Sequence, residues 1–302
     1  ALFQKLFSDT IPHNKALGLK VLAVARGIAS MQLDWREELV GNPETGSRAR
    51  WSLFVTLAAG MQELIDRIAS RLPEGCVRLK TPIKRLIRHT DKKLWTLTAG
   101  SNESHEVDGV ILATPSFQTA DLLGGFASGA ADDLKQIPYA STATVSLAFR
   151  QKDFPRPLDS FGFVVPAIES RKIMACTFSS LKYPGRAPEG HVLLRAFVGG
   201  SLQPKLFEDD DAIMEANVRD ELASLLGVVA QPVFFRVWRH PNSMPQYNVG
   251  HQARIQRIEA QLAQLPGLAL AGSAYHGVGI ADCIRTGEEA AEKIVNHLLG
   301  GC

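Results

Sequence analysis

Residues 268–292 have the sequence LALAGSAYHGVGIADCIRTGEEAAE, and this stretch decides the fold. It begins as a short apolar strand, continues through a turn with Gly272, Gly277 and Gly279, and then takes on helical periodicity toward Ile294. A strand that leads through a glycine-rich turn into a helix presents free backbone N–H groups and the positive end of a helix dipole. The pattern therefore indicates a site for an anionic or electron-rich ligand.

A plain tight turn is the alternative interpretation of this stretch. Glycines are common wherever the backbone needs a positive φ, with or without a ligand. The segment GVGIAD also departs from the dinucleotide-binding pattern GxGxxG, because Asp282 stands where the third glycine is expected. No GxGxxG occurs anywhere in the chain.

Upstream of this stretch, the apolar pattern predicts a broad, largely antiparallel sheet followed by two helices. The expected strands are 143–149, 161–165, 172–178, 191–198 and 233–238, and the expected helices are 213–226 and 251–265. Met214, Val218, Leu222 and Leu225 share one face of the first helix, and Ile255, Ile258, Leu262 and Leu265 share one face of the second.

The first third of the chain predicts a mixed α and β organisation. A turn-rich segment at 41–50 is the expected boundary, with a hairpin at 21–35 before it and an amphipathic helix at 58–72 after it. Strands are then expected at 77–79, 83–87 and 94–98, and a strand buried on both faces at 110–113.

Composition excludes several classes of protein. The 302 residues carry 33 Lys and Arg against 31 Asp and Glu, a net charge of +2, which does not favour nucleic acid as a partner. The four cysteines form no CxxC pair, which argues against zinc and against a disulfide framework. No apolar run is long enough for a membrane-spanning helix. We therefore expect a cytoplasmic protein.

From about residue 47 onward, the chain resembles bacterial protoporphyrinogen and coproporphyrinogen oxidases, FAD-dependent enzymes of haem biosynthesis in the amine oxidase superfamily. The motifs that carry this resemblance are SLFVTLAAGMQELIDRIASRLP, VILATPS, IPYASTATVSLAFR, FGFVVP, CTFSSLKYPGRAPEGHVLLRAFVGG, MPQYNVGH and LALAGSAYHGVGIADCIRTGEEAAE. Several independent motifs in the right order support it. Residues 1–46 instead resemble the N-terminus of a hotdog-fold acyl-CoA thioesterase, although the chain lacks the HGG motif of those enzymes.

The first resemblance implies an FAD-binding α/β domain, a substrate domain with a broad mixed or antiparallel sheet, and a cavity between them. It implies oxidation of a porphyrinogen by flavin-centred chemistry with molecular oxygen as the acceptor, and therefore no catalytic side chain and no metal. The implied flavin contacts are Ile83, Ala113, Thr114, Gly272, Val278, Gly279 and Ile280, and the implied substrate contacts are Tyr183 and, more weakly, Phe163. Because members of the family differ, peripheral membrane association and self-association stay open.

Together, the two resemblances predict an incomplete two-domain oxidoreductase of the α/β (α+β) class without the N-terminal GxGxxG βαβ unit. The predicted domains are a thioesterase-like fragment at 1–46, a partial FAD-binding domain at 47–115 and 266–302, and a substrate-binding domain at 116–265. The predicted function is porphyrinogen oxidation by a truncated or chimeric chain. Two alternatives remain: an inactive tetrapyrrole-binding remnant, and a thioesterase-like protein without its HGG motif.

Overall fold

The computed structural model describes residues 20–25, 28–32, 56–91 and 94–300. The chain divides into two compact units, Ala1–Thr56 and Leu57–Cys302. In the first unit, β1 (Lys20–Ala25) and β2 (Ile28–Gln32) pair antiparallel, which confirms the predicted hairpin. The boundary expected at 41–50 lies outside the described residues.

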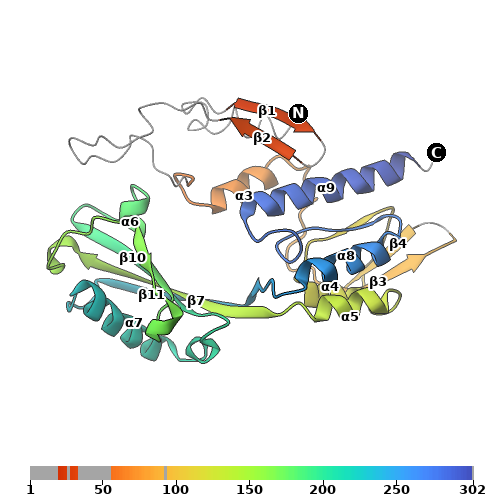
Figure 1. Cartoon of the computed structure of the whole chain (residues 1–302). Coiled ribbons are helices and arrows are strands. Elements are labelled where there is room, and N and C mark those ends of the chain that lie inside the picture. Colours follow the sequence, from red (N-terminus) through yellow and green to blue (C-terminus); the bar gives the residue numbers. More distant parts are fainter. Residues whose placement is uncertain (1–19, 26–27, 33–55, 92–93, 301–302) are drawn as a thin grey trace. The chain divides into compact units, whose positions relative to one another are not determined.

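A five-stranded antiparallel sheet forms one part of the second unit, as predicted (Figure 1). Its strands, in spatial order, are β11 (Phe234–Pro245), β7 (Tyr139–Arg150), β10 (His191–Gly199), β9 (Ala175–Phe178) and β8 (Gly162–Val164). Strands β7 and β10 alternate buried and more exposed side chains along most of their length. Such alternation is typical of a sheet with one face packed on a core.

Helix α7 (Asp211–Leu226) supplies that core. Asp210 caps its N-terminus, because the Asp210 carboxylate accepts from the backbone N–H of Ile213 at 2.8 Å. Met214, Val218 and Leu222 are buried against Val145 and Leu147 of β7 and their neighbours, as the helical spacing predicts. Leu225 is 36% exposed, so it stands at the margin of this core.

A second core is formed by several of the remaining elements of this unit, and one parallel strand pair lies within it. β6 (Val110–Leu112) pairs parallel with β12 (Leu268–Leu270), and the antiparallel strands β3 (Ile83–His89), β4 (Leu94–Ala99) and β5 (Ser104–Val107) form a separate meander. The helices that contribute buried side chains to this core are α4 (Ser116–Leu123), α5 (Ser128–Lys135) and α8 (His251–Leu262). Helix α9 (Ile280–Leu299) packs on β12 through Ala290 and Ile294.

Two expectations from the sequence were wrong, and two helices were missed. Residues 77–79 do not form a strand, because Leu79 is 81% exposed and Lys80 turns the chain with a φ of 55°. Ile111 is 41% exposed, so β6 is not buried on both faces. Helices α4 and α5 were not predicted at all. The helix expected at 58–72 is present as α3 (Gln62–Ala69), although none of its residues is buried.

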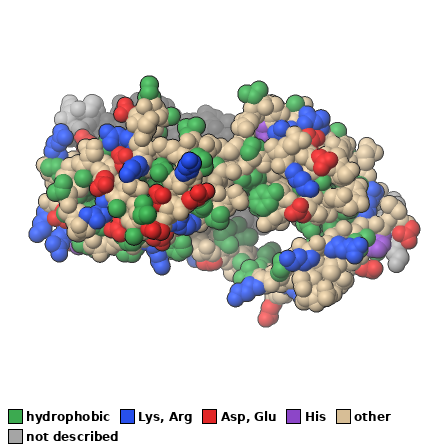
Figure 2. All heavy atoms as spheres, turned by 90° about the horizontal axis from the view of Figure 1, so that it is seen from below, with side chains coloured by type: hydrophobic (Ala, Val, Ile, Leu, Met, Phe, Trp, Pro, Cys, Tyr) green, Lys and Arg blue, Asp and Glu red, His purple; other side chains and the backbone are tan. Residues whose placement is uncertain are grey.

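Figure 2 shows the side of the molecule on which α7 lies, with positive and negative side chains interspersed. Two ion pairs account for part of this pattern: Arg171 with Glu221 at 2.9 Å, and Arg239 with Asp211 at 2.6 Å. Both acidic partners belong to α7. This side therefore presents no broad surface of a single sign.

Candidate functional site

The carboxyl ends of the parallel strands β6 and β12 define the candidate site. β6 continues through Ala113 and Thr114 into α4, and β12 continues through the loop 271–279 into α9. In open α/β sheets, ligands bind beyond the carboxyl ends of parallel strands. Gly272 has a φ of 111°, and a Cβ built there would lie 3.9 Å from the carbonyl oxygen of Ala113. The structure thus brings Gly272 and Ala113 together.

Gly277 is required by the backbone and by a neighbouring side chain. Its φ is 131°, which strains any residue with a Cβ, and a Cβ at this position would overlap the Asp282 carboxylate. Asp282 lies in the first turn of α9, where a negative charge is favoured by the helix dipole. The space beside Gly277 is therefore occupied by Asp282. By contrast, a Cβ at Gly272 meets nothing closer than 3.9 Å.

Tyr247 clamps the two ends of this loop. Its phenol donates to the carbonyl oxygen of Ser273 at 2.6 Å and accepts from the backbone N–H of Gly277 at 2.9 Å. Burial is the main cause that raises the pKa of Tyr247 above its usual value, so the phenol keeps the proton that it donates. The Tyr247 ring stacks on His251 with centroids 3.9 Å apart. Sequence reasoning missed this role, although Tyr247 lies within the motif MPQYNVGH.

Thr286 holds the other end of the loop against α9. Its hydroxyl accepts from the backbone N–H of Gly272 at 3.1 Å and donates to the carbonyl oxygen of Cys283 at 3.1 Å. Gly279 is the N-cap of α9 and has no side chain to cap the helix. Among the described residues, nothing accepts from the backbone N–H groups of residues 280–282. An uncapped helix start behind a bare glycine fits an electron-rich ring or an anion.

Buried hydroxyl groups lie beneath the loop. Thr114 and Thr119 share a hydrogen bond of 2.8 Å between their hydroxyl oxygens, and the Thr119 hydroxyl lies 3.4 Å from the phenol of Tyr275. Desolvation raises the pKa of Tyr275 to about 12, so this phenol stays neutral. The backbone N–H of Ser116, at the start of α4, donates to the Tyr139 phenol at 2.9 Å. These bonds fix the turn after β6.

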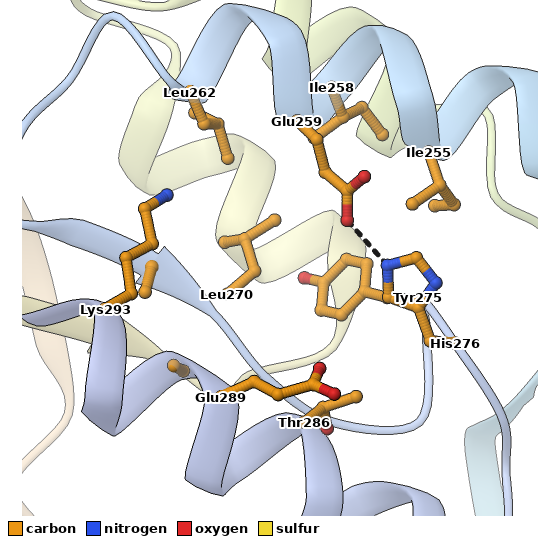
Figure 3. Close-up of a pocket in the computed structure, with 12 residues that line it drawn as sticks. Ile255, Ile258, Glu259, Leu262, Leu270, Tyr275, His276, Thr286, Glu289 and Lys293 are labelled. Atoms are coloured by element: carbon orange, nitrogen blue, oxygen red, sulfur yellow. Dashed lines mark hydrogen bonds and ion pairs between the residues drawn. The ribbon is translucent and has the colours of Figure 1, made fainter. Parts of the chain in front are cut away.

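A cavity of about 160 Å³ lies behind the loop, between α8, β12 and α9 (Figure 3). Its interior is formed by apolar side chains such as Ile258, Leu262 and Leu270. His276 and Glu259 pair at 2.6 Å beside it. Tyr275 and Thr286 line the cavity and also take part in the hydrogen bonds of the loop, so the cavity adjoins the candidate site.

The other predicted flavin contacts are placed as follows. Val278 and Ile280 flank Gly279 at the start of α9, and they are 52% and 55% exposed. Exposed apolar side chains beside an uncapped helix start leave apolar area available for a ligand. Ile83 lies apart from this group, at the first position of β3, where it pairs with Ala99.

The two predicted substrate contacts lie with the five-stranded sheet. Tyr183 ends the short helix α6 (Ser179–Lys182) and is half-buried, with the Lys182 ammonium 5.5 Å from its ring centroid. Phe163 in β8 packs edge-on against Phe178 with centroids 6.1 Å apart. Phe163 therefore contributes to the sheet core, and Tyr183 lies at its margin.

Comparison with known proteins identifies the family. The model of the family described as flavin containing amine oxidoreductase matches residues 6–295. The chain belongs to this family. The predicted resemblance is thereby confirmed, and so is the expectation of a flavoprotein fold. Because the match begins at residue 6, the comparisons give no support to a hotdog origin for residues 1–46.

Three similar proteins place the chain within the flavin containing amine oxidoreductases. Coproporphyrinogen III oxidase of Propionibacterium freudenreichii subsp. freudenreichii is 36% identical over 251 residues, which cover 82% of this chain and 46% of that protein. The enzyme of the same name from Staphylococcus aureus (strain NCTC 8325 / PS 47) is 34% identical over 74% of this chain and 47% of that protein. A crystal structure assigned to protoporphyrinogen oxidase, from Exiguobacterium sp. 255-15, superposes with a TM-score of 0.70 at 33% identity, over 79% of this chain and 51% of that one.

The chain spans about half the length of the curated coproporphyrinogen III oxidases that it matches. No helix in the described ranges is long and apolar enough to cross a membrane. Within those same ranges, no three His, Cys, Asp or Glu side chains are grouped as a metal site would require. Desolvation raises the pKa of the buried Cys176 to about 12, which makes its thiol unreactive.

Proposed function

We propose that this chain contributes to FAD-dependent oxidation of a porphyrinogen in haem biosynthesis, with molecular oxygen as the acceptor. The observation that carries the proposal is the loop at residues 271–279, called here the glycine loop. It follows the carboxyl end of β12 beside β6 and leads into the uncapped start of α9. Curated relatives named coproporphyrinogen III oxidase and protoporphyrinogen oxidase support the substrate class. No other function is supported as well by this site.

In this proposal, each flavin contact has a physical role. Gly272 and Gly279 leave the backbone accessible to a flat ring, and Val278 and Ile280 supply apolar surface beside it. Ala113 and Thr114 border the cofactor from the neighbouring strand. The α9 N–H groups and helix dipole stabilise negative charge on the bound group. Ile83 is assigned to the adenine end by family resemblance alone.

Bound FAD supplies the two-electron oxidation, and the chain supplies position and an apolar surface. Tyr247 keeps Ser273 and Gly277 at a fixed separation, so the loop is shaped before the cofactor arrives. Thr286 fixes Gly272 against the same helix. Tyr183 is proposed to contact the tetrapyrrole from the five-stranded sheet. Phe163 is not included, because the strand register places its side chain on the α7 face, in the sheet core.

We propose a revised division of the domains, based on the two hydrophobic cores. Helices α4, α5 and α8 contribute their buried side chains to the core that holds β6 and β12. The FAD-binding part therefore includes residues 57–137 and 246–299, and the substrate-binding part includes 139–245. A cytoplasmic location, peripheral membrane association and self-association remain predictions.

Flavin retention tests the proposed function. The purified chain is incubated with excess FAD, desalted, and its visible absorption spectrum recorded. We expect the bands of oxidised flavin to remain with the protein and to diminish in a Gly279→Leu variant, whose side chain fills the bare helix start. A Gly125→Leu variant is the matched control, because Gly125 is exposed, has no positive φ and has nothing within 4 Å of an added Cβ. A colourless wild-type protein would show that this chain does not hold the cofactor by itself.

A further inference from the structure

The five-stranded sheet has two different faces. Val145 and Leu147 of β7 point toward α7 and are buried. Ser146 lies between them and points to the opposite face. The strand register pairs Ser146 with Arg195 of β10 on one side and with Arg236 of β11 on the other. Directly paired residues share a face, so both arginines lie in one row on the face away from α7.

The next row of the same face is aromatic. Thr144 pairs with Phe197 on β10 and with Trp238 on β11. Trp238 is 53% exposed, and the Arg236 guanidinium carbon lies 4.7 Å from the centroid of its ring. This cation–π contact holds the guanidinium beside an apolar plane. On the other side of the arginines, Phe234 of β11 pairs with Ala148 of β7 and is 48% exposed.

Within the described part of the chain, the charges of these two arginines are not compensated by ion pairs. On the α7 face, Arg171 and Arg239 each pair with a carboxylate. In the described part of the chain, no carboxylate lies within ion-pair distance of Arg195 or Arg236, and both residues are exposed. Two cations on an exposed aromatic surface complement a flat apolar molecule that carries carboxylates.

We propose that Arg195 and Arg236 bind the carboxylates of the tetrapyrrole, and that Trp238 and Phe197 contact its apolar body. The inference rests on the proposed function and deepens it by assigning the groups that recognise acidic side chains of the substrate. β11 runs from this row toward Tyr247, whose phenol clamps the glycine loop. The arginine row and the glycine loop are therefore connected by one strand and the short segment that follows it.

Porphyrin binding tests this assignment in the full chain, previously incubated with FAD. The probes are coproporphyrin III, which has four carboxylates, and its tetramethyl ester, which has none. Affinity is measured from quenching of porphyrin fluorescence. We expect Arg195→Gln and Arg236→Gln each to weaken binding of the acid by about tenfold, because each removes a charge-assisted hydrogen bond. Neither change should affect the ester. Arg195→Lys and Arg236→Lys should restore part of the affinity.

Arg219→Gln is the matched control, because Arg219 lies on α7, across the sheet from the proposed site. It should bind both probes as the wild type does. Equal binding of the acid by wild type and both glutamine variants would overturn the inference, as would failure of the wild-type chain to bind the acid. Flavin retention is recorded for every sample. If the protein keeps flavin when either of these two results occurs, the proposed function stands and only the assignment of Arg195 and Arg236 fails.

Discussion

Among single residues, Tyr247 joins three separate elements of the candidate site. It follows β11 in the sequence, stacks on His251 at the start of α8, and bonds both ends of the loop after β12. These partners lie up to 30 residues away in the sequence. A pattern of local spacing cannot reveal such a role, because it depends on where separate elements meet.

Replacing Tyr247 by Phe should loosen the loop. The change removes a hydroxyl that satisfies Ser273 and Gly277, which costs about 1–3 kcal/mol in unfolding free energy. Amide hydrogen exchange at Gly277 should become faster, and urea unfolding should shift to lower concentration. Tyr183→Phe is the matched control and should change neither measurement. Unaltered exchange at Gly277 in Tyr247→Phe would contradict the clamp.

His251 should make stability depend on pH. Burial is the main cause that lowers its pKa below 6.5, and nearby Arg254 and His276 act in the same direction, against the hydrogen bond to the Tyr275 carbonyl. The unfolded chain therefore takes up a proton first as pH falls below about 6.5. The unfolding free energy should decline by at most about 1.4 kcal/mol per pH unit from this group.

The measurement compares urea unfolding at neutral and mildly acidic pH for the wild type and His251→Phe. The phenyl ring keeps the stacking partner of Tyr247 and cannot titrate. We expect the variant to lose less stability on acidification than the wild type. Both proteins keep the pair of His276 and Glu259, so they differ only at residue 251. An identical decline in both proteins would show that His251 contributes no pH dependence.

Among the elements, the helices and strands with strong periodicity were predicted and the weakly patterned ones were missed. Helix α7 and strands β7 and β10 match their predicted apolar faces. The sequences SFQTADLL and SGAADDLK of α4 and α5 are short and rich in small or polar residues, so their spacing carried little information. The apolar face of α3 was predicted, yet Ile65 and Ile68 are 57% and 45% exposed.

The glycine loop was predicted from the sequence, but the structural reason for a glycine at position 277 was not. Proximity of Gly272 to Ala113 follows from the parallel pairing of β12 with β6. Gly277 belongs to a turn that was predicted to bind a ligand, and the structure places the Asp282 carboxylate against it. That contact depends on the turn geometry at the start of α9, which the sequence pattern does not specify.

Gly277→Ala should therefore destabilise the loop by more than backbone strain alone. The variant adds overlap with Asp282 to the cost of a positive φ, so we expect a loss of more than about 1 kcal/mol. Gly190→Ala provides the comparison, because Gly190 has a φ of 72° and nothing within 4 Å of the added Cβ. Thermal unfolding of both variants gives the difference. Equal losses would mean that Asp282 moves aside without cost.

In the molecule as a whole, two continuous strands join the two cores of residues 57–300. β7 and β11 are each 12 residues long and belong to the five-stranded sheet. Tyr139, at the start of β7, bonds the first turn of α4, and the backbone N–H of Gln246 donates to the carbonyl oxygen of Pro138 at 2.8 Å. The fold class was predicted because each core has its own pattern of strands and helices.

Unfolding of the two cores should coincide because these strands connect them. Trp95 is buried in the core that holds β6 and β12, and Trp238 lies on the five-stranded sheet. Variants that keep only one of these two tryptophans, with Trp35 and Trp51 also replaced, should each unfold at the same urea midpoint by fluorescence as by far-UV circular dichroism. Far-UV circular dichroism of each variant controls for altered stability. Two separated midpoints would show that the cores unfold independently.

The pairing of β11 with β7 is interrupted between His240 and Met244, and Asn242 there has a φ of 44°. Before this bulge, β11 carries Arg236 and Trp238. After the bulge, the chain leads to Tyr247. A bulge bends its strand and increases the local twist. The irregular segment at 240–244 therefore sets the direction in which the chain runs from the arginine row to the glycine loop.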